Sequence, residues 1–225
     1  MGKKVAFFDI DGVIYDGHTI FDIILDQQES GFITQDLYKS IMKDLASYKS
    51  GKKSYTQAAN SMLKKSAQVF KGKKYSQILT YNYNFLRQQK HKFFDYFPKT
   101  LNVLKRTYDV YLVSTNFQFT VEAVAKIFNV DYFLSSIVEV SNGLVTGKVA
   151  LSLAGNKGIV RKTVDNYGRT GSIAVGDSEN DAPMLESVEN ALVFEPNEKM
   201  GQTAVTKGWT IVDRNNAHTH ILDLI

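Results

Sequence analysis

The sequence contains no cysteine, three prolines and a single tryptophan in 225 residues. The lack of cysteine excludes a disulfide framework, thiol catalysis and the thiolate ligands of structural zinc sites. No run of 18 apolar residues occurs, so no membrane-spanning helix is predicted. The first residues pass into a short apolar segment without the longer apolar stretch of a signal peptide. We therefore expect a cytoplasmic protein that does not associate with membranes.

Positive charge is concentrated in one part of the chain. Residues 39–74 hold ten lysines and one acidic residue, Asp44, so this segment carries +9 and the rest of the chain, whose total is +4, carries −5. Such a segment either attracts anions, including phosphorylated small molecules, or forms an ordinary solvated helix surface. No groove-reading or base-stacking motif accompanies the lysines, so nucleic-acid binding is not expected.

The first half of the chain has the pattern of helices. Apolar residues recur at helical spacing between residues 19 and 90, and Gly31, Gly51 and Gly72 interrupt the pattern as glycines at helix ends do. The predicted helices cover residues 19–28, 35–48, 55–70 and 75–90.

The remaining chain alternates between strand and helix patterns. Strands are predicted at 5–10, 110–114, 132–134, 172–177, 190–195 and 209–212, and a separate hairpin at 137–149 turns at Asn142-Gly143. Helices are predicted at 99–106, 119–128, from about 156, around Pro183 and at 199–205. This alternation favours an α/β fold, a Rossmann-like parallel sheet with helices on both faces, with a small all-helical cap inserted after the first strand. The predicted domains are a core (1–15 and 93–225) and a cap (16–92).

Polar side chains follow several of the predicted strands at the point where each strand ends. They are Asp9 and Asp11, then Ser114, Thr115 and Asn116, then Asp177 with Asn180 and Asp181 one turn later, and Lys157 at the start of a helix. Parallel strands have their carboxyl ends at one edge of the sheet, where ligands bind. Crowded carboxylates repel one another unless a cation lies among them, and Mg²⁺ takes carboxylate oxygens together with phosphate. The ammonium of Lys157 and the hydroxyl of Ser114, placed beside such a metal, could bind the oxygens of a phosphate group.

These residues lie in motifs that resemble a known family. In chain order, "DIDGV", "VSTN", the lysine of "GNKG" and "GDSENDAPML" resemble the four motifs of the haloacid dehalogenase superfamily. The similarity is greatest to its phosphoserine phosphatase-like branch and continues through residues 113–149. The helical insert lies where that branch has its cap.

The resemblance implies a Mg²⁺-dependent phosphatase that hydrolyses a small-molecule phosphomonoester through an aspartyl-phosphate, acting as a monomer or homodimer. By this resemblance Asp9 is the nucleophile, and Asp11 is the general acid and later the general base. The implied metal ligands are the Asp9 carboxylate, the Asp11 backbone carbonyl and Asp177, with Asp181 as a further ligand or a support. The implied phosphate- and substrate-binding residues are Ser114, Thr115, Asn116, Lys157, Asn180 and His18.

Several positions differ from the phosphoserine phosphatases, and two of the differences concern the groups that hold the substrate. Those enzymes hold the substrate ammonium with a glutamate, and the corresponding position here falls at or near His18, with no glutamate. They hold the substrate carboxylate with an arginine of the cap, and the insert here has only one arginine, Arg87. Phosphoserine specificity is therefore not implied. Each motif alone also has a plainer interpretation, such as an Asp-Gly turn or a helix cap. Two alternative functions stay open, a phosphotransferase to another alcohol and a non-hydrolytic module that binds phosphorylated metabolites.

Overall fold

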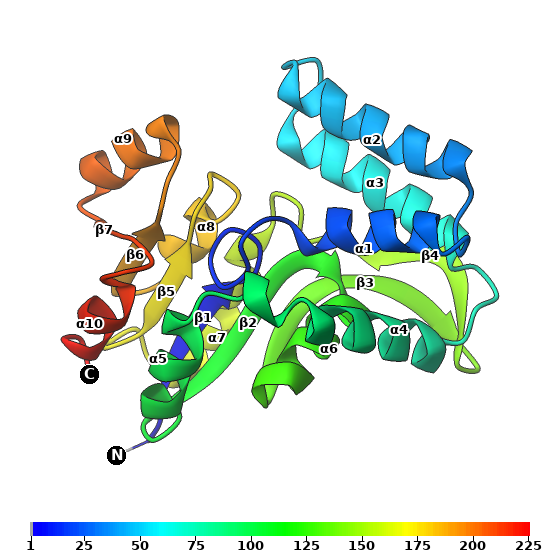
Figure 1. Ribbon diagram of the computed structural model, residues 1–225. Coiled ribbons are helices and arrows are strands. Elements are labelled where there is room, and N and C mark those ends of the chain that lie inside the picture. Colours follow the sequence, from blue (N-terminus) through cyan, green and yellow to red (C-terminus); the bar gives the residue numbers. More distant parts are fainter. Residues whose placement is uncertain (1) are drawn as a thin grey trace.

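A single seven-stranded sheet organises the chain (Figure 1). The computed structural model describes residues 2–225. The strand order is β4-β3-β2-β1-β5-β6-β7, and neighbouring strands are parallel except for the antiparallel pair β3 and β4. The strands are β1 (Lys4–Asp9), β2 (Tyr108–Phe117), β3 (Tyr132–Ser141), β4 (Leu144–Leu151), β5 (Ile173–Gly176), β6 (Asn190–Phe194) and β7 (Thr210–Val212). The predicted α/β class is confirmed.

The central strand β1 is apolar at almost every position because both of its faces are covered. Ala6 and Phe8 point into one apolar core and Val5 and Phe7 into the other, in the alternation that a strand imposes. The first core lies under α5 (Tyr96–Leu104), α6 (Gln118–Phe128) and α10 (Ala217–Leu222). The second lies under α7 (Val160–Tyr167), α8 (Ala182–Leu185) and α9 (Glu198–Lys207). Two buried layers hold β1 rigidly, and its last residue is Asp9.

Four helices, here called the cap, lie between β1 and α5, as predicted. They are α1 (Thr19–Glu29), α2 (Gln35–Lys49), α3 (Tyr55–Val69) and α4 (Tyr75–Gln88), each within two residues of its predicted bounds. The cap helices α2 and α3 stand above the strands, while α3 also packs on β4 and α4 packs on α6 (Figure 1). The division into a core and a cap domain stays a prediction.

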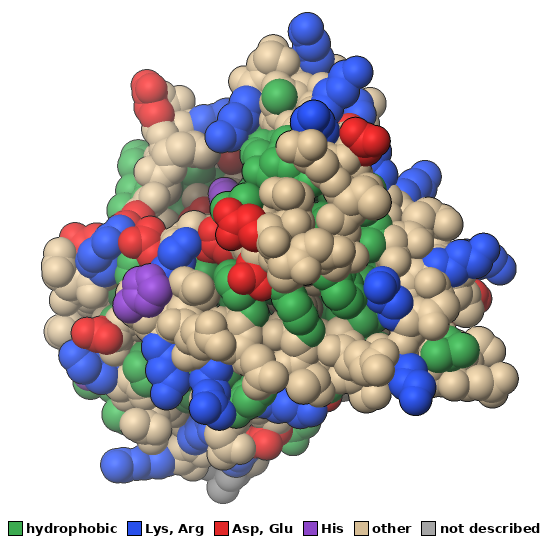
Figure 2. All heavy atoms as spheres, turned by 45° about the vertical axis from the view of Figure 1, so that its right-hand side comes forward, with side chains coloured by type: hydrophobic (Ala, Val, Ile, Leu, Met, Phe, Trp, Pro, Cys, Tyr) green, Lys and Arg blue, Asp and Glu red, His purple; other side chains and the backbone are tan. Residues whose placement is uncertain are grey.

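A buried carboxylate joins the cap helices. Asp44 of α2 is 3% exposed and accepts hydrogen bonds from Lys65 of α3, at 2.6 Å, and from Lys53, at 2.7 Å. Burial opposes the ionisation of Asp44, but these two ammonium groups hold its pKa below the ordinary value. The one acidic residue of the lysine-rich segment therefore has a structural role. Most of its lysines are solvated, and Figure 2 shows blue side chains over the top of the molecule, where α2 and α3 lie.

Several details of the fold differ from the sequence-based prediction, among them the length of β2, which has ten residues where five were predicted. β3 is one ten-residue strand, whereas a short strand and a separate hairpin were predicted; its first half pairs with β2 and its second half with β4. Helix α5 begins at Tyr96 and not at residue 99, because a proline such as Pro98 is tolerated in the first turn of a helix. Helix α10 was not predicted. The predicted turn is confirmed, since Asn142 and Gly143 both have positive φ, as a type I′ turn requires.

None of the helices within residues 2–225 combines the length and the apolar character needed to cross a membrane.

Candidate active site

Three carboxylates from two neighbouring strand ends meet at the upper edge of the sheet. Asp9 is the last residue of β1, Asp177 follows β5, and Asp181 immediately precedes α8. One carboxylate oxygen from each lies within 4.8 Å of the others. The backbone makes room for this meeting at Gly12, which has φ +76°, and where a Cβ would collide with the Asp177 carboxylate. Glycine is therefore required at this position of the first motif.

A buried lysine lies against two of these carboxylates. Lys157 is 2% exposed, and its Nζ lies 2.8 Å from Asp9 Oδ1 and 2.5 Å from Asp181 Oδ1. It sits in a short 3₁₀ helix (Lys157–Ile159) that leads into α7. A buried ammonium is stable only when charge partners surround it, and here both partners are themselves buried. The lysine motif and the two aspartate motifs thus form one contact group.

Asp181 is held by the protein through both of its oxygens. Its Oδ1 accepts from Lys157, while its Oδ2 accepts from the backbone N–H groups of Asp177 and Ser178, at 3.1 Å each, and from Ser178 Oγ at 2.9 Å. This carboxylate therefore fixes the position of the ammonium and shapes the turn that carries Asp177. Its own oxygens are already engaged by protein donors.

One ammonium does not neutralise three clustered carboxylates, of which Asp9 and Asp181 are buried and Asp177 is half-buried, and the pKa values of the group show the remaining repulsion. Burial, with the negative charge of Asp181, raises the pKa of Asp9 to about 8 and shifts the pKa of Asp177 upward in the same way. Burial also opposes the ionisation of Asp181, but Lys157 keeps the pKa of that carboxyl below its ordinary value. Burial alone would lower the pKa of Lys157, yet Asp181 and Asp9 raise it. A hard divalent cation at Asp9 and Asp177 would relieve the remaining repulsion, and carboxylate oxygens are its preferred ligands.

The carboxylate of Asp11 lies outside this group and has its own donors. The backbone N–H and the hydroxyl of Thr19 both donate to Asp11 Oδ1 at 2.8 Å, and Asn116 Nδ2 donates to Oδ2 at 3.1 Å. Asn116 also donates to the Thr19 hydroxyl at 2.7 Å, which closes a small network. The two aspartates of the first motif thus have different surroundings. Asp9 is buried among charges, whereas Asp11 is half-buried and oriented by neutral donors.

The end of β2 contributes the neighbouring polar residues. Ser114 is buried, and its hydroxyl accepts from the backbone N–H of Asn116 at 3.2 Å. The Thr115 hydroxyl accepts from Asn180 Nδ2 at 3.3 Å and from the hydroxyl of Tyr55 at 3.2 Å. Tyr55 is the first residue of α3, so this hydrogen bond joins the cap to the site. Burial raises the pKa of Tyr55 to about 12, and its phenol is therefore a donor at neutral pH.

The predicted site residues thus gather at one edge of the sheet. His18 is exposed and lines a cavity together with Asp11 and Asn116, rather than joining the carboxylate group. Three contacting residues were not predicted, namely Thr19, Tyr55 and Ser178. The contact of Thr19 could have been predicted from the sequence, since Thr19 begins the first helix after the aspartate motif. Tyr55 had none, because its contact exists only after the cap has folded onto the core.

Comparison with known proteins finds similarities both in sequence and in fold. A family model described as haloacid dehalogenase-like hydrolase matches residues 3–189. A phosphoserine phosphatase from Streptococcus thermophilus is 34% identical over 94 residues, which cover 40% of this chain and 44% of that protein. The match therefore spans less than half the length of this curated relative.

Solved structures extend the similarity over the whole fold. A protein of unknown function from Bordetella pertussis Tohama I has a TM-score of 0.77 at 19% identity, over 95% of this chain and 100% of that chain. A substrate-bound phosphoserine phosphatase has a TM-score of 0.67 at 22% identity, over 100% of this chain and 99% of that chain. At these identities the likeness establishes the fold.

Proposed function

The chain belongs to the haloacid dehalogenase-like hydrolases, and from this membership we propose that it is a divalent-metal-dependent phosphatase that hydrolyses a small-molecule phosphomonoester. The observation that carries the proposal is the buried group in which Lys157 contacts Asp9 and Asp181 beside Asp177. The phosphoserine phosphatase relatives support the same reaction class. The cytoplasmic location and the oligomeric state stay predictions.

The residues present fit a bound Mg²⁺. Asp9 and Asp177 would hold it with their carboxylates, whose raised pKa values mark unrelieved negative charge. The backbone carbonyl of Asp11 is the third ligand implied by the family motif. When bound, the cation neutralises charge on Asp9 and on the phosphoryl oxygens. We assign Asp181 the supporting role, because protein donors already engage both of its oxygens.

Asp9 is suited to attack phosphorus through one particular oxygen. Its Oδ1 accepts from the backbone N–H of Ile10 at 2.7 Å and contacts Lys157 at 2.8 Å. Within residues 2–225, its Oδ2 accepts no hydrogen bond, so it is the oxygen that can form the aspartyl-phosphate. The ammonium of Lys157 reduces the repulsion between this carboxylate and an incoming phosphate dianion. The hydroxyl of Ser114 and Lys157 are the proposed phosphate contacts, together with Thr115 and Asn116.

Asp11 would protonate the leaving oxygen and later remove a proton from the attacking water. Thr19 and Asn116 hold its two oxygens in place, which fixes the direction in which the acid donates. Asn180 holds the loop at Gly155 through its Oδ1, at 2.8 Å, and contacts Thr115 through its Nδ2, so we place it on the substrate side of the site.

The experiment that tests the function is phosphate release from methyl phosphate, the smallest phosphomonoester, and from acetyl phosphate, an acyl phosphate with a very small leaving group. We expect release with Mg²⁺, none above the spontaneous rate in EDTA, and a loss of at least about a thousandfold in the enzymatic rate in Asp9→Asn. Asp131→Asn makes the same change at an exposed loop position and should behave as the wild type. Turnover that persists in both EDTA and the Asp9 variant contradicts the proposal.

A further inference from the structure

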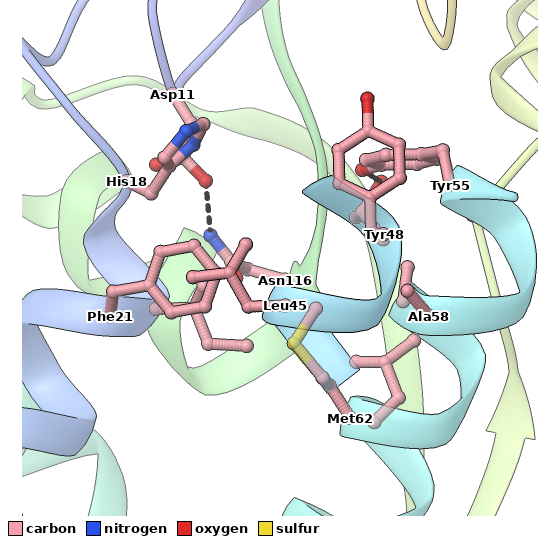
Figure 3. A pocket seen from close by; sticks show the side chains of 13 residues that line it. Asp11, His18, Phe21, Leu45, Tyr48, Tyr55, Ala58, Met62 and Asn116 are labelled. Atoms are coloured by element: carbon pink, nitrogen blue, oxygen red, sulfur yellow. Dashed lines mark hydrogen bonds between the residues drawn. The ribbon is translucent and has the colours of Figure 1, made fainter. Parts of the chain in front are cut away.

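The proton donor Asp11 borders a cavity of about 100 Å³ between the cap and the core. Figure 3 shows the side chains of Phe21, Leu45, Ala58 and Met62 arranged around it, with Asp11 and Asn116 at its polar end. Its apolar wall comes from three cap helices, with Phe21 on α1, Leu45 on α2, and Ala58 and Met62 on α3. Folding of the cap over the sheet edge therefore creates a binding space beside the catalytic carboxylates.

The apolar wall of this cavity offers no charged partner for the ammonium and carboxylate groups of an amino acid. Among the described residues that line it, Asp11 is the only acid, His18 is the only basic side chain, and neither lysine nor arginine is present. Arg87 lies on the exposed side of α4 and does not line the cavity. A carboxylate and an ammonium buried against this wall would lose their water without gaining counter-charges, which is costly. The apolar wall instead favours an uncharged hydrocarbon group of the substrate.

The position of the cavity determines which part of a substrate it receives. Asp11 must reach the oxygen that leaves phosphorus, and its carboxylate lies at the polar end of the cavity (Figure 3). The carbon attached to that oxygen then points toward Ala58 and Met62. We infer that the substrate is the phosphate monoester of a short, uncharged, apolar alcohol, an inference that rests on the proposed phosphatase function.

The size of the cavity limits the length of that alcohol. An apolar protein cavity of about 150 Å³ admits benzene, so roughly 100 Å³ holds a chain of about three to five carbons. Each methylene that leaves water for this wall should raise kcat/KM roughly fourfold, the equivalent of about 0.8 kcal/mol. The rise should stop once the cavity is full.

The test is kcat/KM for phosphate release from methyl, ethyl, propyl, butyl and hexyl phosphate, with O-phosphoserine as the comparator for propyl phosphate. Propyl phosphate and O-phosphoserine share a three-carbon skeleton and differ in the charged groups. We expect the value to climb from methyl to butyl phosphate and then level off. We also expect propyl phosphate to exceed O-phosphoserine at least tenfold.

A matched pair of variants locates the effect. Ala58→Leu fills the cavity from α3, whereas Ala46→Leu makes the same change on the exposed side of α2. The first should lower kcat/KM for butyl phosphate at least tenfold more than it lowers kcat/KM for acetyl phosphate. The second should change neither. Thermal unfolding of both variants checks that they fold.

The outcomes separate the two claims. No release from acetyl phosphate or any ester overturns the proposed function, and this inference with it. Release that is insensitive to chain length, or that is fastest with O-phosphoserine, overturns the substrate class and leaves the phosphatase proposal standing. Equal losses from Ala58→Leu with acetyl and butyl phosphate also contradict the role assigned to the cavity.

Discussion

Replacing Asp9 by asparagine should stabilise the metal-free protein at every pH above about 4. In the folded metal-free state the pKa of Asp9 is about 8, against an ordinary value of 3.8, because burial and Asp181 oppose its ionisation. Between these two pH values the folded chain keeps a proton that the unfolded chain releases. The unfolded state then binds fewer protons, so the free energy of unfolding falls as pH rises. By pH 7 this loss is on the order of 4 kcal/mol, and Asp177 acts in the same direction.

The assay is urea denaturation followed by circular dichroism from about pH 4 to pH 8, in EDTA. Asp9→Asn removes the titrating group, so its curve should meet that of the wild type near pH 4 and lie above it at pH 8. Asp131→Asn should follow the wild type throughout, since Asp131 is exposed.

Magnesium should narrow this difference in stability between the variant and the wild type. A ligand that binds only the folded state adds about 2.7 kcal/mol at a hundred times its Kd, and the variant would lose this gain with its metal ligand. A variant that is less stable than the wild type at pH 8 in EDTA would refute the reasoning. That result would mean that Asp9 is an ordinary stabilising ion-pair partner and not a crowded, strained carboxylate.

Three further substitutions test other contacts. Lys157→Met removes the cation between two buried carboxylates, and we expect a loss of about 3–5 kcal/mol in urea denaturation near neutral pH. Thr19→Val removes a hydroxyl donor to Asp11, so kcat should fall roughly tenfold with little change in KM, and an equal fall in Thr206→Val, on the exposed side of α9, would contradict a local effect. Asp44→Asn should cost about 1.5–3 kcal/mol at pH 7. Because the pKa of Asp44 is lowered, this difference should begin to shrink as pH falls below about 4 and should vanish once pH is below the lowered pKa of the folded state. A difference that does not shrink in acid would oppose the assignment.

Much of the fold could be predicted because its signals are local. The cap helices carry apolar residues at helical spacing over ten or more residues, and glycines follow the ends of the first three, so the predicted bounds are correct within two residues. The convergence of Asp9 and Asp177 also follows from the sequence, since both come at the carboxyl ends of parallel strands that prove to be neighbours.

The rest depends on contacts between distant segments. Helix α10 has six residues, which is too few for a helical period to be detected in the sequence. Its buried residues Ala217 and Ile221 pack in the same core as α5, and this contact cannot be predicted from the local sequence. The hydrogen bond from Tyr55 to Thr115 spans sixty positions, and the apolar cavity beside Asp11 forms from three helices at once. The sequence predicts the chemistry of the site but not the shape of the space beside it.

The most direct test of the central claim is to locate the phosphoryl group during turnover. Asp11→Asn should slow the attack of water, so acid quenching of this variant with acetyl phosphate and Mg²⁺, followed by tandem mass spectrometry, should find one phosphoryl group on Asp9. The same reaction in EDTA should leave Asp9 unmodified. If the wild type turns over while the label lies on another residue, or on none in the variant, the account of Asp9 as the nucleophile is wrong.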